Sequence, residues 1–272
     1  MSGPDFDDYL AGTKLYGNDF NQEELEAWYA DEVRGYASLG ASEWGPGHYQ
    51  YHALNSVHGF RYLPAGQIGS ALGLGSAYAD EFEPIVDRLS AITVLEPAVS
   101  LRAISVGGLR VRYIDPNASG IMPFDDDIFD LATSFGTLHH IPNVGTVIRE
   151  LARVVRPGAY LLIREPIVSM GDWRRPRAGL TARERGVPPR LLRGFYQAAG
   201  LTLVKETYCM AVVTNVLNRH VYHRLYDSPV AVRGDALIAR LLRPNYRYYA
   251  TGVLRRLRPT SVFHVLMKPQ LN

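Results

Sequence analysis

The chain has 272 residues, 47% of them hydrophobic and 21% charged, an ordinary make-up for a globular protein built on one large domain. It contains one cysteine, Cys209, which excludes an intrachain disulfide and a cysteine-based metal cage. No apolar run approaches the ~20 residues that a membrane span needs, and the opening segment lacks the basic-then-apolar order of a signal peptide. We therefore expect a cytoplasmic protein.

The net charge of +2 conceals two parts of opposite sign. Residues 1–173 contain 11 Lys and Arg against 23 Asp and Glu, a net of −12, whereas residues 174–272 contain 18 against 4, a net of +14. Such asymmetry can indicate an anionic partner for the basic part. The alternative is that the two parts attract each other within one fold.

The first 62 residues are predicted to form a helical and aromatic cap or lid. Residues 21–39 are expected to be a helix, because Asn21 precedes a first turn rich in Glu. A cluster of aromatic and histidine residues follows this helix. Its members are Trp44, His48, Tyr49, Tyr51, His52, His58, Phe60 and Tyr62.

Strands and helices alternate over the next hundred residues. Short apolar runs predict five strands, at residues 68–72, 92–95, 109–114, 129–135 and 159–163. Helices are expected between them, at residues 83–89 and 143–155, and in the second of these the apolar residues repeat on one face. This alternation predicts an α/β fold with a parallel sheet and right-handed crossovers.

The last part of the chain has a different pattern. A helix at residues 189–199 and a strand at 201–206 are followed by a long segment rich in Arg and Tyr, and residues 261–267 form a closing strand. We interpret residues 209–258, approximately, as an insertion on the face where ligands bind. The core is then residues 63–272.

Two glycines follow the first predicted strand, at Gly73 and Gly75. They allow a tight turn and a close approach of a ligand to the backbone. Glu96 ends the second strand, 23 residues after Gly73, where an acidic side chain can bind ribose hydroxyls. Tyr78 occupies the position of the third glycine of a dinucleotide site, and its side chain would crowd a pyrophosphate. An adenosine with a short zwitterionic arm fits better than a dinucleotide.

At this point the sequence resembles a known family. Asn117-Ala118 and residues 122–131, 137–143 and 149–158 are similar, in order and spacing, to the adenine loop and fourth strand region of class I S-adenosylmethionine-dependent methyltransferases, small-molecule and sugar O-methyltransferases among them. The resemblance covers about residues 66–166 and implies a Rossmann-like fold with an antiparallel last strand. It also implies S-adenosyl-L-methionine as cofactor.

The resemblance assigns roles to individual residues. Gly73 and Gly75 would line the amino-acid arm of the cofactor, and Glu96 would hold its ribose. Asn117 and Ala118 would lie at the adenine edge, with Phe135 as a further cofactor contact at the end of the fourth strand. The chain departs from the family in two places. Ala71 stands where an acidic residue is usual, which removes a polar group near the charged arm, and Ala77 replaces a third glycine.

Catalytic candidates follow the fourth and fifth strands. Methyl transfer to oxygen is an in-line displacement that needs an aligned acceptor and a general base, which is most often His. His139 and His140 follow the fourth strand and Glu165 ends the fifth, so they are expected at neighbouring edges of one cleft. The resemblance implies that one His is the base, with His139 favoured over His140, and that Glu165 assists it. The other His is then a packing residue.

Substrate candidates come from two further features. Tyr49 of the aromatic cluster could stack on a sugar, or could belong to the seam of the cap. Trp173 and Arg174 begin a basic run that could bind phosphate or carboxylate, or could be a solvated face. Its other members are Arg175, Arg177, Arg183, Arg185, Arg190 and Arg193. Three adjacent acids, Asp125 to Asp127, are expected to form a solvated turn, so no metal is predicted.

The sequence thus predicts methyl transfer to a hydroxyl of a small molecule, a saccharide or natural product, anionic if the basic run binds it. The alternatives are a non-methylating, cyclase-like enzyme on the same fold and a non-catalytic protein that binds the cofactor. Nitrogen or nucleic-acid methylation is disfavoured, because the Asn/Asp-Pro-Pro-aromatic motif is absent after the fourth strand. Association of the chain with copies of itself is left open.

Overall fold

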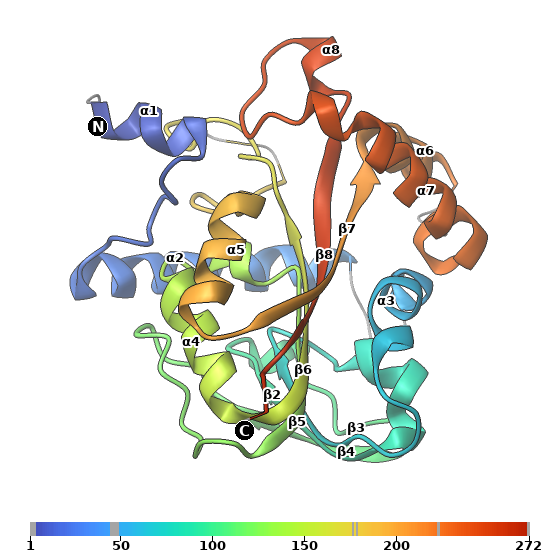
Figure 1. Cartoon of the computed structure of the whole chain (residues 1–272). Coiled ribbons are helices and arrows are strands. Elements are labelled where there is room, and N and C mark those ends of the chain that lie inside the picture. Colours follow the sequence, from blue (N-terminus) through green and yellow to red (C-terminus); the bar gives the residue numbers. More distant parts are fainter. Residues whose placement is uncertain (1–3, 44–48, 176, 178, 222–223, 271–272) are drawn as a thin grey trace.

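The structure, a computed structural model, describes residues 4–43, 49–175, 177, 179–221 and 224–270. In these ranges eight strands form one sheet, in the order β3-β4-β2-β1-β5-β6-β8-β7 (Figure 1). The strands are β1 Gly69–Leu74, β2 Leu89–Leu95, β3 Ser105–Val106, β4 Leu109–Ile114, β5 Phe129–Phe135, β6 Val155–Pro166, β7 Thr202–Ala211 and β8 Pro259–Met267.

The sheet is parallel at its centre and antiparallel at its edges. Strand β1 pairs parallel with β2 and β5, β2 with β4, and β5 with β6. Strand β8 lies antiparallel to both β6 and β7, and the short β3 is antiparallel to β4. The predicted Rossmann-like α/β fold, with an antiparallel last strand, is confirmed. The strand order reverses between β1 and β5, where open α/β sheets bind ligands.

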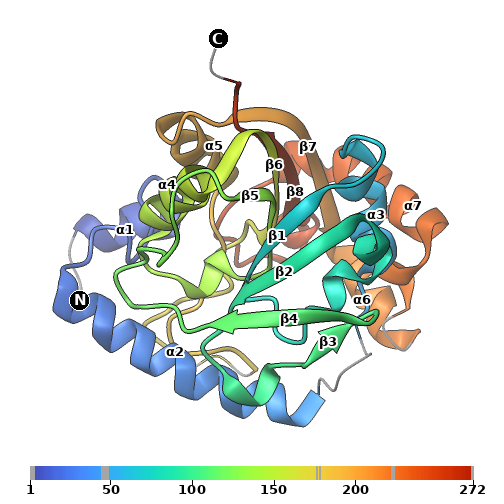
Figure 2. The ribbon, with the colours of Figure 1, turned by 90° about the horizontal axis from the view of Figure 1, so that it is seen from below.

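Helices cover both faces of the sheet (Figures 1 and 2). The α-helices of the described residues are α1 Pro4–Ala11, α2 Gln22–Glu43, α3 His52–His58, α4 Val144–Val154, α5 Pro189–Ala198, α6 Val212–His220, α7 Pro229–Leu242 and α8 Val253–Arg256. Short 3₁₀ helices include η2 Asp80–Arg88, η4 Leu138–His140 and η5 Leu225–Asp227.

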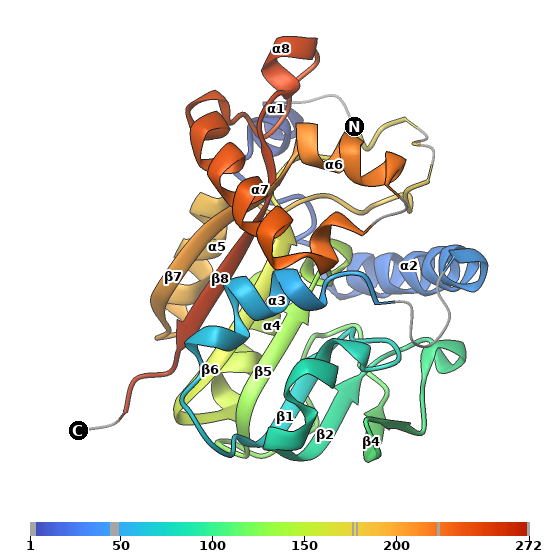
Figure 3. The same ribbon diagram turned by 90° about the vertical axis from the view of Figure 1, so that its right-hand side faces the viewer.

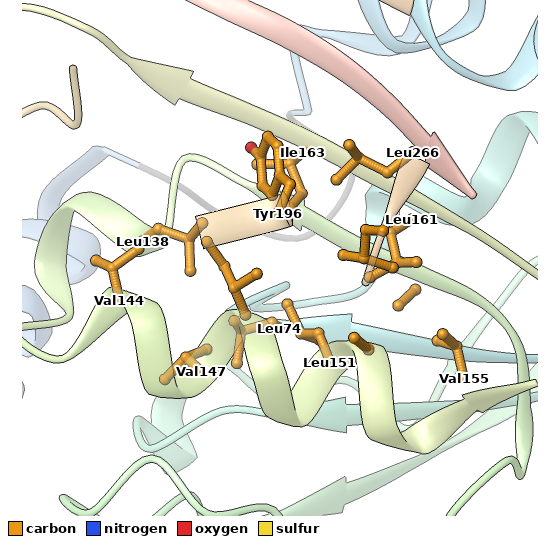
Figure 4. Close-up of a cluster of buried hydrophobic side chains, with 14 of the residues drawn as sticks. Leu74, Leu138, Val144, Val147, Leu151, Val155, Leu161, Ile163, Tyr196 and Leu266 are labelled. Carbon is orange, nitrogen blue, oxygen red and sulfur yellow. The ribbon is translucent and has the colours of Figure 1, made fainter. Parts of the chain in front are cut away.

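Each face of the sheet has its own hydrophobic core. On one face, α4 and α5 pack over the sheet, with Val147 and Leu151 against Leu161 and Tyr196 (Figure 4). On the other face, α3 and α7 cover the sheet and contact each other. The apolar stripe predicted for α4 is therefore the stripe that this helix buries.

Several element boundaries differ from the sequence prediction. The helix expected at residues 83–89 is the 3₁₀ helix η2, which contains Pro84, a residue without the N–H that an interior α-helical turn needs. The strand expected at 159–163 is longer, because β6 pairs with β8 along seven positions. Strand β7 runs to Ala211, so the first helix of the predicted insertion begins at Val212.

The N-terminal residues do not lie together as a single layer. Helix α2 lies across the carboxyl ends of the parallel strands, whereas α3 packs on the face of the sheet that α7 covers (Figure 3). The aromatic cluster is divided accordingly. Tyr51 stacks on Tyr226, and Phe60 packs against Phe135 in the sheet core. Trp44 and His48 lie outside the described residues. Within the described ranges, every helix is too short or too polar to cross a bilayer.

Candidate active site

A pocket lies at the carboxyl ends of the central strands, where the strand order reverses. It encloses about 940 Å³ of empty space, part of it open to solvent. The ends of four strands, the loops that follow them, and two helices contribute its lining. The strand ends and loops are those of β1 (Leu74, Gly75), β2 (Leu95, Glu96, Pro97), β4 (Pro116, Asn117, Ala118, Gly120, Ile121, Met122) and β5 (Gly136, Thr137, His140, Ile141, Pro142, Asn143), and the helices are α2 (Tyr29, Glu32) and α4 (Val147).

The loop after β1 comes close to the loop after β5. Gly75 has a φ of +63°, in the left-handed region, and a Cβ at this position would collide with the Thr137 side chain. The Thr137 Oγ1 donates to the carbonyl of Leu74 at 2.9 Å, which joins the two loops. Gly75 therefore lines the pocket because only glycine satisfies both the φ and the close approach.

Gly73 is the last but one residue of strand β1. It is absent from the lining residues, and a Cβ there would collide with the Ser76 hydroxyl. Gly73 thus allows Ser76 of the following loop to pack closely against β1. Ala77, in place of the usual third glycine, adopts a φ of +43°. The Tyr78 hydroxyl lies 3.5 Å from the carbonyl oxygen of Ser100, in the segment after β2.

The Glu96 carboxylate is buried at the pocket wall, with 1% of the residue exposed. Its Oε1 accepts from the Ala98 N–H at 2.8 Å and its Oε2 from the Ala77 N–H at 3.2 Å. Burial raises the pKa of this carboxyl, although both backbone donors favour its charged form. Each oxygen retains a second lone pair. The site therefore suits a ligand that presents neighbouring hydroxyls.

The loop after β4 supplies an apolar slot. Asn117 and Ala118 line the pocket as predicted, together with Ile121 and Met122. The Asn117 side chain donates to the carbonyl of Ile121 at 3.1 Å and so fixes this loop. A flat heterocycle fits between such side chains, since stacking on apolar surface needs no polar partner.

Glu165 anchors the turn that follows β5. Its Oε1 accepts from the N–H groups of Thr137 and Leu138 at 2.9 and 2.8 Å, and its Oε2 accepts from the N–H of His139 at 3.2 Å. The same Oε2 lies 3.0 Å from His139 Nδ1. Glu165 is fully buried, and these donors satisfy both oxygens of its carboxyl group. It does not line the pocket.

The two histidines occupy different environments. His139 is buried. This burial is the main cause that lowers the pKa of its ring, and the neighbouring His140 is the second. His140 lines the pocket, and its Nδ1 lies 2.8 Å from Glu32 Oε2 of α2. The two rings are 4.1 Å apart between centroids. The sequence favoured His139 over His140, but the pocket surface carries His140.

Phe135 is part of the sheet core and is absent from the pocket lining. Its ring packs against Phe60 and Phe263, with centroids 6.2 and 5.4 Å apart. The backbone of the next residue, Gly136, does line the pocket. The main chain that follows β5 thus reaches the pocket, whereas the Phe135 side chain packs in the sheet core.

The predicted substrate residues also lie away from this pocket. Trp173 stacks on Tyr16, with centroids 5.2 Å apart, in a cluster beside α1. Arg174 is exposed and pairs with Asp172 at 2.8 Å. The Tyr49 hydroxyl accepts from the Asn55 side chain at 2.6 Å on the opposite side of the sheet. None of the three lines the pocket.

The basic run is largely a structural feature. Arg185 is fully buried and donates to main-chain carbonyls, among them those of Tyr16, His139 and Ile141. Arg177 likewise donates to the carbonyls of Thr181, Ala182 and Glu184. Arg183 pairs with Asp31 of α2, and Arg193 with Glu206. These four arginines therefore have partners within the protein, carbonyls for Arg185 and Arg177 and carboxylates for Arg183 and Arg193.

Sequence reasoning missed the contribution of α2. Trp28 is fully buried and its Nε1 donates to the carbonyl of His140 at 2.8 Å, and the Tyr29 hydroxyl donates to the carbonyl of Pro116 at 2.9 Å. Glu32, one turn after Trp28, contacts His140. The only available signal was that Trp28 and Glu32 have helical spacing, four residues apart.

The three adjacent acids do not converge. Asp126 pairs with Arg153 at 2.7 Å and Asp127 with Lys268 at 2.6 Å, whereas Asp125 is exposed. Across the described ranges, no group of His, Cys, Asp and Glu is arranged to hold a metal ion. The acids therefore behave as charged groups of a surface turn.

Comparison with known proteins agrees with this geometry. Residues 68–163 match the family model described as a methyltransferase domain. Over 45 residues the chain is 51% identical to a demethylmenaquinone methyltransferase of Mycobacterium tuberculosis, a match that covers 16% of this chain and 19% of that protein. Over 46 residues it is 39% identical to the sterol 4-C-methyltransferase strm-1 of Caenorhabditis elegans, covering 17% and 14%. The chain thus spans about a fifth or less of these relatives.

Solved structures share the fold over most of the chain. The 4+2 cyclase SpnF has a TM-score of 0.55 at 16% identity, covering 92% of this chain and 97% of that one. The phosphoethanolamine N-methyltransferase 2 of Haemonchus contortus, in complex with S-adenosyl-L-methionine, has a TM-score of 0.57 at 14% identity, covering 94% and 61%. Residues 68–163 thus match a methyltransferase domain, and these solved structures share the fold of the chain.

Proposed function

We propose that this protein is an S-adenosylmethionine-dependent methyltransferase that acts on a hydroxyl of a small molecule. The observation that carries the proposal is the pocket at the strand-order reversal. It combines a glycine turn, a buried carboxylate with free acceptor positions and an apolar slot, which are the three parts that an adenosine with an amino-acid arm needs. The match of residues 68–163 to a methyltransferase domain supports the cofactor.

The residues present fit this cofactor. Gly75 would present its main chain to the amino-acid arm, because it lines the pocket and has no side chain of its own. Glu96 would accept both ribose hydroxyls, and Asn117 and Met122 would border the adenine. S-adenosylmethionine supplies a methyl group on a positively charged sulfur.

His140 is our candidate for the general base. It lies on the pocket surface and its Nδ1 faces the Glu32 carboxylate. When Nδ1 carries the proton, it donates a hydrogen bond to Glu32 Oε2, and Nε2 is the basic nitrogen that can remove the proton of an acceptor hydroxyl. Trp28 donates to the carbonyl of His140 and fixes the backbone of the base. His139 and Glu165 then position the turn that carries His140.

The acceptor is proposed to be a saccharide or other natural product. Part of the pocket is open to solvent, and its lining is mainly apolar with few polar groups, as is typical of small-molecule sites. The wall beside His140 is formed by Glu32 and Pro142. A carboxylate at this wall disfavours an anionic acceptor group next to the base.

A second candidate is transfer to carbon, favoured by the match to a sterol 4-C-methyltransferase. A carbon acceptor must also lose a proton, so His140 would keep its role. A third, a cyclase-like enzyme, is favoured by the structural likeness to SpnF and by the loss of the usual acidic residue at Ala71. Methyl-labelled cofactor separates these reactions, because only the first two move the label, to oxygen or to carbon.

The test is turnover with labelled cofactor and a panel of acceptors, in the wild type, His140→Ala and His139→Ala. We expect His140→Ala to lower turnover about 10²–10⁴-fold with cofactor affinity nearly unchanged. His139→Ala is expected to retain more activity and to lose stability. Turnover within about threefold of the wild type in both variants would exclude a histidine base. Cyclised product without label transfer would replace the proposal with the third candidate.

A further inference from the structure

Helix α6 presents its apolar side chains to solvent. Val213, Val216 and Leu217 are about half exposed, at 48%, 52% and 51%, and they recur at the i, i+3, i+4 spacing of one helical face. The inward positions are polar, since Thr214 and Asn218 are buried. The orientation is thus opposite to that of an ordinary surface helix.

Helix α7 also exposes apolar side chains, and its buried side carries Asp235 together with Val232 and Ala239. Val230, Leu237 and Leu241 are 77%, 59% and 70% exposed, at the i, i+7, i+11 spacing of one face. Asp235 lies on the buried side with 2% exposed. Figures 1 and 3 show α6 and α7 as neighbours on the outside of the molecule, with α8 beyond them. In α8, Val253 and Leu254 are 80% and 77% exposed.

One buried carboxylate fixes this orientation. Asp235 accepts from the backbone N–H groups of Met210 and Ala211 at 2.6 and 2.9 Å, and also from the Thr214 hydroxyl of α6. The Asn218 side chain accepts from the N–H of Leu225 at 2.9 Å. These polar contacts hold both helices against β7 and η5. Because these polar contacts occupy the buried sides, the exposed Val and Leu side chains of both helices face solvent.

The same segment is strongly basic. Residues 212–258 contain nine Arg against two acids, a net of +7, and one of those acids is the buried Asp235. Arg219, Arg233 and Arg240 are exposed beside the apolar residues. None of these three has a carboxylate within 4.0 Å among the residues that the structure describes. A second copy of this surface would bring equal positive charges together, which opposes self-association.

We propose that α6, α7 and α8 dock this protein onto a lipid bilayer that carries anionic head groups. Exposed Val and Leu on short helices enter the boundary between head groups and acyl chains, while arginines bind the phosphates above it. A nucleic acid would use the arginines but gives no reason for eight exposed Val and Leu side chains on three helices. The inference is independent of the acceptor and of the catalytic residues.

The experiment is co-sedimentation of the full chain with vesicles of phosphatidylcholine alone and of phosphatidylcholine mixed with phosphatidylglycerol. We expect binding to the mixed vesicles, weakened by salt because exposed charges are screened. Leu237→Ser with Leu241→Ser is expected to weaken binding about tenfold or more. Arg233→Glu with Arg240→Glu is expected to abolish the preference for anionic vesicles.

Matched variants control for exposure and charge. Val99→Ser with Ile104→Ser removes two apolar side chains of similar exposure, 73% and 81%, from the other end of the sheet. Arg110→Glu with Arg112→Glu reverses two exposed charges on β4. Both should bind vesicles like the wild type. The proposal is overturned if the wild type does not sediment with anionic vesicles at low salt, or if the control variants lose as much binding. It is also overturned if Leu237→Ser with Leu241→Ser converts a dimer to a monomer while vesicle binding is unchanged.

Discussion

Arg185 shows how a residue chosen for substrate binding becomes part of the scaffold. Its guanidinium is fully buried, and it donates to the carbonyls of Leu138, His139, Ile141 and Pro142. These carbonyls belong to the turn that carries the candidate base, so one side chain fixes the main chain of the site. Burial lowers the pKa of Arg185 to about 10, which still leaves it charged at neutral pH.

Arg185→Met should therefore destabilise the protein and loosen the turn. Several buried carbonyls would lose their donor, and an unsatisfied buried polar group costs about 1–3 kcal/mol. We expect a loss of about 3 kcal/mol or more in the free energy of unfolding, measured by denaturant titration. Arg190→Met, at an exposed position on α5, should change it by less than about 0.5 kcal/mol. Equal effects would mean that Arg185 is not a structural anchor.

Glu81 is a second buried charge that sequence patterns did not identify. Its carboxyl lies under the loop after β1, where it contacts the hydroxyls of Ser76 and Thr133. Burial raises the pKa of Glu81 to about 7, against an ordinary value of 4.5. The folded state thus holds this proton more tightly than the unfolded state does. Its contribution to stability is complete below about pH 4.5 and is lost as the pH rises through about 7.

Glu81→Gln removes this pH dependence while keeping the shape of the side chain. Relative to the variant, the wild type should lose up to about 3 kcal/mol of unfolding free energy between pH 4.5 and 7, since one pKa unit corresponds to 1.36 kcal/mol. Denaturant titrations of both proteins at pH 5 and pH 8 measure the difference. Parallel stability curves across this range would show that Glu81 titrates normally.

Among the elements, the loop after β1 depends most directly on glycine. Gly75→Ala should weaken cofactor binding at least about tenfold, because its Cβ would collide with Thr137 and its φ of +63° disfavours any side chain. Gly108→Ala is the matched control, since Gly108 has a φ of +83° but open space around it. It should cost about 1 kcal/mol of stability and leave binding unchanged. Calorimetric titration compares the two. Unchanged affinity in Gly75→Ala would mean that the ligand does not approach this loop.

The central strands and α4 could be predicted from the sequence because each carries a complete local signal. Strands β4 and β5 were predicted with their observed bounds, and α4 within one residue at each end. Glu96 followed from its position at a strand end, whereas Asn117 and Ala118 were implied by the family resemblance, and all three line the pocket. The strands, the helix and Glu96 depend on short-range spacing and on the rule that ligands bind at the carboxyl ends of parallel strands.

The remaining site residues depend on contacts that no local pattern encodes. Glu32 meets His140 across 108 positions of the chain, and Arg185 meets Tyr16 across 169. The polarity of α6 reverses because Asp235, on another helix, binds Thr214. In each case a polar group bonds to a partner from a distant element. The contact, and with it the role of the residue, therefore could not be predicted from the sequence.

At the scale of the whole molecule, the two parts of opposite charge do meet. Arg183 pairs with Asp31 at 2.8 Å and Lys268 with Asp127 at 2.6 Å, each joining the basic part to the acidic part. Attraction between the acidic and the basic part within one fold therefore accounts for part of the uneven charge distribution along the sequence. The positive charge of residues 212–258 is outside these pairs, and it is the part that we assign to a lipid surface.

The central claim is that the pocket at the strand-order reversal binds S-adenosylmethionine through Glu96. Calorimetric titration of the wild type, Glu96→Ala and the exposed control Glu83→Ala tests it most directly. We predict binding by the wild type and Glu83→Ala, and a loss of about 1.5–3 kcal/mol in Glu96→Ala, the usual contribution of hydrogen bonds to a charged group. No binding by the wild type, or equal affinity in all three proteins, would contradict the account.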